Sequence, residues 1–194
     1  MPSRNRNMPV AMSRAKRAEE VSTAFRADYR AYQYRFVEFY IEHVVDVGRA
    51  FKGDLQSVLV LAVLGQVWLK AVRAAEAEGQ DPDAIPQDRL SITSSRISDV
   101  TDIPRQTVRR KLKELERRGW LLRNDDGAYR LASSGGRSTA RRDLSDVDGR
   151  ALERIAKLFV ELEGLVEAQA DRASRAGQTE QSGNVLKSSG SGVP

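Results

Sequence analysis

The chain of 194 residues has no cysteine and only one histidine, His43. A disulfide framework and a thiolate site are therefore excluded, and so is a metal centre built from several histidines. The longest apolar run, Val58 to Leu64, is too short to cross a bilayer. The arginines near the N-terminus are followed by no apolar segment like that of a signal peptide. We therefore expect a cytoplasmic protein that has no membrane partner.

The first 78 residues predict a disordered arm followed by a helical region. Residues 1–18 contain five basic and no acidic residues and predict a disordered basic arm. Residues 19–78 predict a helical region that forms core and dimer contacts. The segment from Leu55 to Ala75 is apolar almost all round and predicts a buried central helix. Before it, apolar residues recur every three or four positions, as on one face of a single long helix: Val21, Phe25, Tyr29, Tyr32, Phe36, Tyr40, Val44, Val47 and Phe51.

The remaining boundaries follow from changes in composition. A polar loop with two prolines at residues 79–88 precedes a compact unit at residues 89–132. Residues 133–142 are expected to form a loose basic linker. Residues 144–170 repeat apolar positions at helical spacing and predict a C-terminal dimerisation helix. Residues 171–194 are polar, rich in serine and glycine near the end, and predict a disordered tail.

Residues 89–132 are typical of two short helices followed by a hairpin. Ser94 or Ser95 is expected to cap the first helix, and Asp102–Pro104 to form the turn between the helices. A glycine ends the second helix, and Asn124–Gly127 form the hairpin loop. Six apolar residues are spaced to form one buried seam between the helices: Ile97, Val100, Ile103, Val108, Leu112 and Leu115.

Positive charge is concentrated on the second of these helices. The whole chain has a net charge of +5. The segment Arg105–Arg118 contains seven basic and two acidic residues, whereas Asp54–Asp88 contains two basic and six acidic residues. The solvent-facing side of the helix is expected to consist of Arg105, Gln106, Arg109, Arg110 and Lys113. A helix that buries valine and leucine behind such a face suits a negatively charged groove, which makes DNA the first partner to consider.

The stretch DIPRQTVRRKLKELERRGWL, at residues 102–121, resembles the second helix and following strand of winged helix-turn-helix transcription factors. The order of the flanking elements is similar to that of MarR-type regulators, in which long helices on either side of the winged unit make a dimer. The resemblance implies a mainly α fold with a small β-wing, in which a winged helix-turn-helix is flanked by long dimerisation helices.

The resemblance also implies a role for each residue that matches the pattern. Arg105, Gln106 and Arg109 would reach base edges in the major groove, where arginine pairs with guanine and glutamine with adenine. Thr107, Arg110 and Lys113 would lie where phosphates pass and would fix the register. Ser94 and Ser95 would place the amide end of the first helix near a phosphate. Arg123, Asn124 and Arg130 would belong to the wing, which in this family contacts the neighbouring minor groove or backbone.

The expected partners are double-stranded DNA and a second copy of the chain. MarR-type regulators often bind a small aromatic effector, and Trp68, Tyr32 and Phe36 are candidates to line such a pocket. No cofactor, metal or enzymatic activity is expected, because the sequence has neither a nucleophile–base pair nor a glycine-rich phosphate loop. Two alternatives stay open: a winged-helix module for protein–protein interaction, and a DNA-binding factor outside the MarR type, such as a replication, partition or phage-type regulator.

Overall fold

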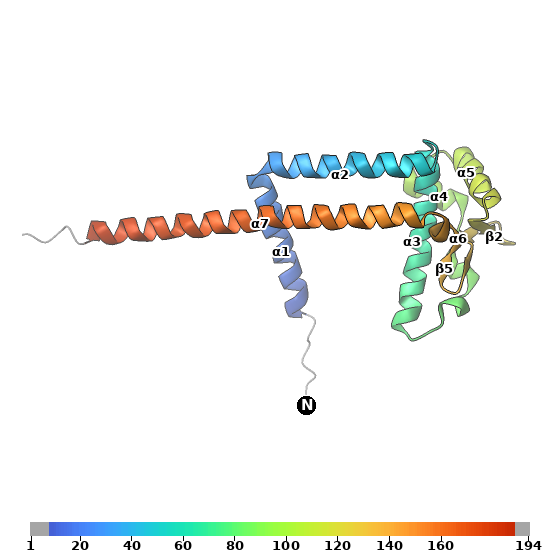
Figure 1. The fold of residues 1–194 in the computed structure, drawn as a ribbon. Coiled ribbons are helices and arrows are strands. Elements are labelled where there is room, and N and C mark those ends of the chain that lie inside the picture. The colour runs from blue at the N-terminus through green and yellow to red at the C-terminus, as the bar shows by residue number, and fades with distance from the viewer. Residues whose placement is uncertain (1–7, 189–194) are drawn as a thin grey trace, which may run out of the picture. The chain divides into compact units, whose positions relative to one another are not determined.

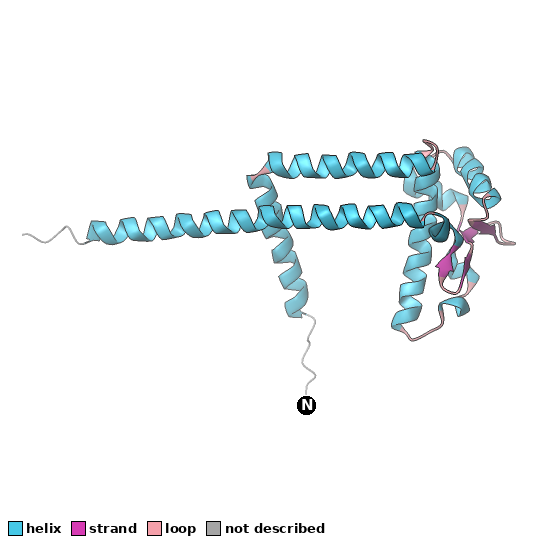
Figure 2. Ribbon diagram, in the orientation of Figure 1, coloured by secondary structure: helices cyan, strands magenta, loops and turns pink. Residues whose placement is uncertain are grey.

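The computed structural model describes the backbone of residues 8–188 and the side chains of residues 14–176. The chain is mainly helical, with 76% helix and 7% strand, and its few strands pair antiparallel (Figure 2). It divides into two compact units. We call them the helical unit, from Met1–Ile41 and Glu153–Pro194, and the mixed unit, from Glu42–Leu152.

The elements are labelled in Figure 1 where there is room. They are α1 (Met8–Ala27), α2 (Tyr29–Ala50), α3 (Leu55–Ala77), η1 (Pro82–Ala84), η2 (Gln87–Leu90), β1 (Ser91–Ile92), α4 (Ser94–Thr101), α5 (Arg105–Arg117), β2 (Leu121–Arg123), β3 (Tyr129–Leu131), β4 (Ser133–Ser134), β5 (Arg137–Ser138), α6 (Thr139–Asp143) and α7 (Ser145–Ser188). Helices α2 and α7 contribute residues to both units.

Both predicted disordered ends are helical where the structure describes them. Helix α1 begins at Met8, within the predicted arm at residues 1–18, and α7 continues through the predicted tail from residue 171 to Ser188. These segments are polar, but alanine, arginine, lysine, glutamate and glutamine are good helix formers. The helices therefore extend into both segments, and the disorder predicted for them stays a prediction. Residues 1–7 and 189–194 lie outside the described residues.

The long helix predicted through the aromatic stripe is divided at Asp28 into α1 and α2. Aspartate is unfavourable inside a helix, because its short side chain competes for backbone hydrogen bonds. Within the helical unit, the ring of Tyr32 stacks on the rings of Phe25 and Phe36, at centroid distances of 4.9 and 6.0 Å. Helices α2 and α7 are joined there by Arg35, whose Nη1 lies 3.9 Å from the Glu161 carboxylate.

The core of the mixed unit forms around α3, as its apolar composition predicts. One face of α3 is buried against residues from α4, α5 and the strands. The buried side chains of this core include Val60, Leu64, Trp68, Val72, Ile97, Val108, Leu112, Leu115, Trp120 and Leu121. The apolar character of α3 extends beyond its buried face, because Leu55, Leu59 and Leu69 on this helix are exposed. The whole helix is long and apolar enough to cross a membrane by length and composition, a test that core helices of soluble proteins also pass.

Two hairpins follow α5. Strands β1, β3 and β2 form an antiparallel sheet in that order, in which Arg123 pairs with Tyr129 and Leu121 with Leu131. Strands β4 and β5 form a second hairpin, so the segment expected to be a loose linker is structured. Its turn is Gly135-Gly136, with φ of 58° and 68°, and two consecutive positive φ values are what a two-residue hairpin turn requires.

The helix pair α4–α5 matches the predicted positions with two corrections. Thr93 caps α4, since its Oγ1 accepts from the Arg96 amide at 3.3 Å, and the serines expected to cap, Ser94 and Ser95, are the first residues of the helix. Val100 is 58% exposed and is not part of the seam. It lies about 60° around α4 from the fully buried Ile97.

Candidate nucleic-acid interface

Helix α5 has two chemically different faces. Its inward side consists of Val108, Lys111, Leu112 and Leu115, all buried. Gln106, Arg109, Arg110 and Lys113 lie on the exposed side. The helix ends at Arg117 and the chain turns at Gly119, where φ is +73°, while the Trp120 amide donates to the Leu115 carbonyl at 3.2 Å. This ending turns the chain directly from α5 into β2.

A groove of about 750 Å³ lies between α5 and the β2–β3 hairpin, and we call it the α5 groove. Four of its side chains are basic and one, Asp126, is acidic. Its lining residues are Thr93, Ser94, Gln106, Arg109, Arg110, Lys113, Arg123, Asp126, Gly127 and Tyr129. Six of the predicted site residues, from α4, α5 and β2, are thus brought together on one positively charged surface.

The other five predicted residues do not line this groove. Arg105 is exposed at the start of α5, where its Nη2 lies 3.8 Å from the Asp99 carboxylate. Arg130 Nε donates to Asn124 Oδ1 at 3.1 Å, so these two side chains hold each other within the hairpin. The remaining two, Ser95 on α4 and Thr107 on α5, are half-buried.

Sequence reasoning missed Thr93, Asp126, Gly127 and Tyr129. The Tyr129 ring is buried beneath Arg123, whose guanidinium carbon lies 5.8 Å from the ring centroid. Register could have indicated this pair, because directly opposed residues of an antiparallel hairpin lie on the same face. Gly127 has φ of +82°, and a Cβ there would lie 3.5 Å from Arg123 Nη2. That distance is an ordinary contact, so glycine suits this position because of its positive φ and not for lack of space.

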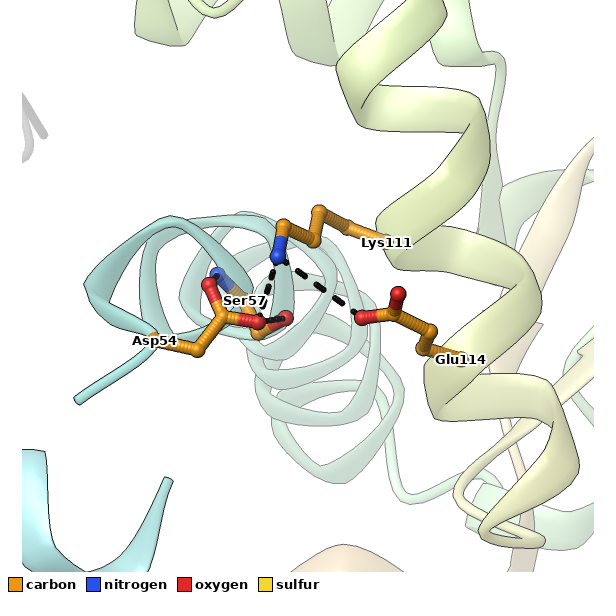
Figure 3. Close-up of polar contacts among 4 residues, drawn as sticks. All are labelled: Asp54, Ser57, Lys111 and Glu114. Carbon is orange, nitrogen blue, oxygen red and sulfur yellow. Dashed lines mark hydrogen bonds and ion pairs between the residues drawn. The ribbon is translucent and has the colours of Figure 1, made fainter. Parts of the chain in front are cut away.

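Lys111 is the buried basic residue of α5, and its side chain points toward Asp54 and Glu114 (Figure 3). Its Nζ donates to Asp54 Oδ2 at 2.6 Å and lies 3.7 Å from Glu114 Oε2. Asp54 also caps α3, because its carboxylate accepts from the Ser57 amide at 3.1 Å and from Ser57 Oγ at 2.6 Å. The network joins the inward side of α5 to the start of α3, across 57 residues of sequence.

Opposing effects act on the pKa of Asp54. Burial alone would raise it, but the hydrogen bonds from Lys111 and Ser57, together with the positive charge of Lys111, hold the pKa below its usual value of 3.8. The carboxylate is therefore charged at neutral pH and forms an ion pair with Lys111. The sequence contains a signal for this arrangement, since a lysine occupies a position of the seam between Val108 and Leu112.

Arg118 makes cation–π contacts within the mixed unit. Its guanidinium carbon lies 5.1 Å from the Trp120 ring centroid and 5.7 Å from that of Phe51. Trp120 Nε1 in turn donates to Asp143 Oδ2 at 2.9 Å. Lys111 is buried, so the basic residues that α5 presents to solvent are Arg105, Arg109, Arg110, Lys113 and Arg117. Arg118, directly after the helix, is exposed as well.

The residues expected to line an effector pocket belong to different units. Trp68 is buried in the core of the mixed unit, whereas Tyr32 and Phe36 stack in the helical unit. Within the residues that the structure describes, no group of three or more His, Cys, Asp or Glu side chains is placed to hold a metal ion.

Comparison of the chain with models of protein families, with curated proteins and with solved structures finds no match. The resemblance to MarR-type regulators therefore depends on the residues of this chain alone and stays a prediction.

Proposed function

We propose that the protein is a sequence-specific transcriptional regulator of the winged helix-turn-helix type that binds double-stranded DNA in the cytoplasm. Helices α4 and α5 would be the helix-turn-helix, and the β2–β3 hairpin the wing. The α5 groove is the observation that supports this function best. It combines Arg109, Arg110, Lys113 and Arg123 with a helix whose apolar side chains all face the core.

In this proposal α5 enters the major groove, which is wide enough to admit a helix. Gln106 and Arg109 face the α5 groove from successive turns of the helix and would contact base edges. Arg110 and Lys113 would contact phosphates and fix the register of the protein on the duplex. Arg123, held above Tyr129, would bring the wing to the neighbouring backbone or minor groove.

A homodimer completes the proposal. The helical unit leaves large apolar side chains exposed on α2 and α7 in the single chain: Tyr29, Tyr34, Phe36, Val37, Tyr40, Ile41, Ile155, Phe159 and Val160. Soluble monomers rarely expose apolar surface on this scale, and a two-fold pair would bury the same surface on both copies. Such a dimer would present two copies of α5 to DNA, with half-sites about one helical turn apart.

The decisive experiment is selection of bound duplexes from random DNA, followed by footprinting and affinity measurement at several salt concentrations. We expect an inverted repeat and an affinity that falls steeply with salt, because bound counterions are released from the phosphates. Arg109→Ala should relax the preference for the selected sequence at one base pair. The matched control is Lys70→Gln/Arg73→Gln, which removes two exposed positive charges from α3, away from the α5 groove, and should keep that preference. If the protein shifts no duplex at about 50 mM salt, the proposal is wrong and a protein–protein module becomes the better hypothesis.

A further inference from the structure

A second groove of about 750 Å³ lies in the mixed unit and shares no lining residue with the α5 groove. We call it the arginine groove. Its lining contains three arginines and four hydroxyl side chains: Ser134, Arg137, Ser138, Thr139, Arg141, Arg142 and Ser145. None of these is acidic or apolar, so the surface offers hydrogen-bond donors and positive charge.

The fold holds this surface in place through local hydrogen bonds. The buried Ser138 accepts from the Arg141 amide at 3.2 Å and thereby caps α6, so β5 passes directly into the helix that contains two of the arginines. The Thr139 amide donates to the Ala132 carbonyl at 2.8 Å and closes the base of the β4–β5 hairpin. At its tip, the Gly136 amide donates to Asp83 Oδ1 at 3.3 Å, which ties the hairpin to η1. The arginines therefore project from a structured element.

The ion pairs that Arg141 and Arg142 form in this structure are weak. Arg141 Nε lies 3.9 Å from Asp148 and Arg142 Nε lies 3.4 Å from Asp143, and these arginine side chains are 66% and 75% exposed. Exposed ion pairs at such distances contribute little, so they do not prevent the guanidinium groups from binding another anion. Asp143 also accepts a hydrogen bond from Trp120 Nε1 at 2.9 Å. The Asp143 carboxylate therefore keeps a hydrogen-bond partner when Arg142 binds another anion.

Guanidinium and hydroxyl groups are among the side-chain groups that contact phosphate oxygens in protein–DNA complexes. Three arginines around one groove can each pair with a different phosphate of a nucleic-acid backbone. We propose that the arginine groove binds backbone phosphates of the same duplex that occupies the α5 groove, and so adds contacts that do not depend on base sequence. This inference rests on the proposed function, since it requires a protein that binds DNA.

The test is Arg141→Gln/Arg142→Gln, compared with wild type and with Lys70→Gln/Arg73→Gln, which removes the same charge from another surface of the mixed unit. Each phosphate contact contributes about 0.9 to the slope of log affinity against log salt, so loss of two contacts should lower the slope by about 1.8. Between about 50 and about 200 mM salt, the affinity of wild type should then fall roughly twelve-fold more than that of the variant. The loss should be equal on selected and random duplexes, and hydroxyl-radical footprinting should show protection lost at flanking phosphates and kept at the centre.

The outcomes separate the two proposals. If wild type binds DNA while the arginine variant keeps the wild-type slope and footprint, the inference is wrong and the proposed function stands. The inference is also wrong if both double variants lower the slope equally, because the effect is then one of general charge. A calorimetric titration with inorganic phosphate addresses a free ligand: phosphate binding that is lost in the arginine variant without any change in DNA binding would overturn the assignment to DNA. If wild type binds no duplex at any salt concentration, the proposed function itself fails. A thermal unfolding midpoint equal to that of wild type would show that the arginine variant is folded.

Discussion

Replacing Lys111 by methionine tests whether the Asp54–Lys111 pair attaches α5 to the core. The Lys111 side chain is 10% exposed and that of Asp54 is 25% exposed. Methionine keeps most of the apolar stem and removes the ammonium group. Hydrogen bonds to charged groups contribute about 1.5–3 kcal/mol, and breaking a fully buried ion pair costs about 3–5 kcal/mol. Because Asp54 keeps its bonds to Ser57 and partial contact with water, we expect the free energy of unfolding to fall by about 2 kcal/mol.

The pair can be separated from the helix cap by the choice of partner variant. Asp54→Asn removes the charge but keeps a side-chain oxygen that can accept from the Ser57 amide. A double-mutant cycle with Asp54→Asn and Lys111→Met then isolates the interaction between the two side chains. We expect a coupling free energy of about 1–2 kcal/mol, because both groups are largely desolvated and their atoms are 2.6 Å apart.

Urea unfolding followed by tryptophan fluorescence is the appropriate assay. The chain has two tryptophans, Trp68 and Trp120, and both lie in the core of the mixed unit, so the signal reports this unit. Lys113→Met is the matched control, since Lys113 is exposed on the same helix and its replacement should change stability by no more than about 0.5 kcal/mol. A coupling free energy under about 0.5 kcal/mol would refute the reasoning, because the two sites would then behave as independent.

Three further predictions concern pH, DNA and assembly. Because the folded state lowers the pKa of Asp54, the stability that this carboxylate contributes is present above its ordinary pKa of 3.8. That contribution is lost as pH falls through the lower folded-state pKa. The difference in free energy of unfolding between wild type and Lys111→Met, measured in urea, should therefore shrink below about pH 4. Arg109→Ala should cost roughly 1–3 kcal/mol on the selected duplex and relax preference at one base pair, whereas Arg110→Ala should weaken selected and random duplexes alike and lower the salt slope by about one; a uniform loss for Arg109→Ala would move the base contact to Arg105 and Gln106. Light scattering at micromolar concentration should give twice the chain mass of 21.6 kDa, and a clean single-chain mass would count against the dimer.

The two faces of α5 were predictable because helical periodicity fixes both at once. Once Val108, Leu112 and Leu115 are assigned to the core, Arg109 and Lys113 must lie on the other side. The hairpin was predictable for a similar reason, since the asparagine-to-glycine loop separates two short runs of strand-forming residues. Five of the six predicted residues that meet in the α5 groove lie on these two elements, and the sixth, Ser94, was expected from the resemblance.

What the sequence did not indicate depends on long-range partners or on choices between equivalent residues. Lys111 was counted with the positive charge of α5, because its acidic partner, Asp54, lies on a distant element. Thr93, Ser94 and Ser95 are three consecutive residues that can each cap a helix, and the fold selects the first. The division at Asp28 has no glycine or proline to announce it. The arginine groove was missed because a serine- and glycine-rich segment was interpreted as a linker.

The separation of the two faces of α5 has a consequence for redesign of the protein. Gln106, Arg109 and Arg110 line the α5 groove, and the buried side chains of the helix are different residues. Replacing the three groove residues removes no core contact, so stability places little restriction on which side chains these positions accept. A library randomised at these positions should consist mostly of folded proteins. Under the proposed function, the same backbone could then be retargeted to new DNA sequences by selection at a few surface positions.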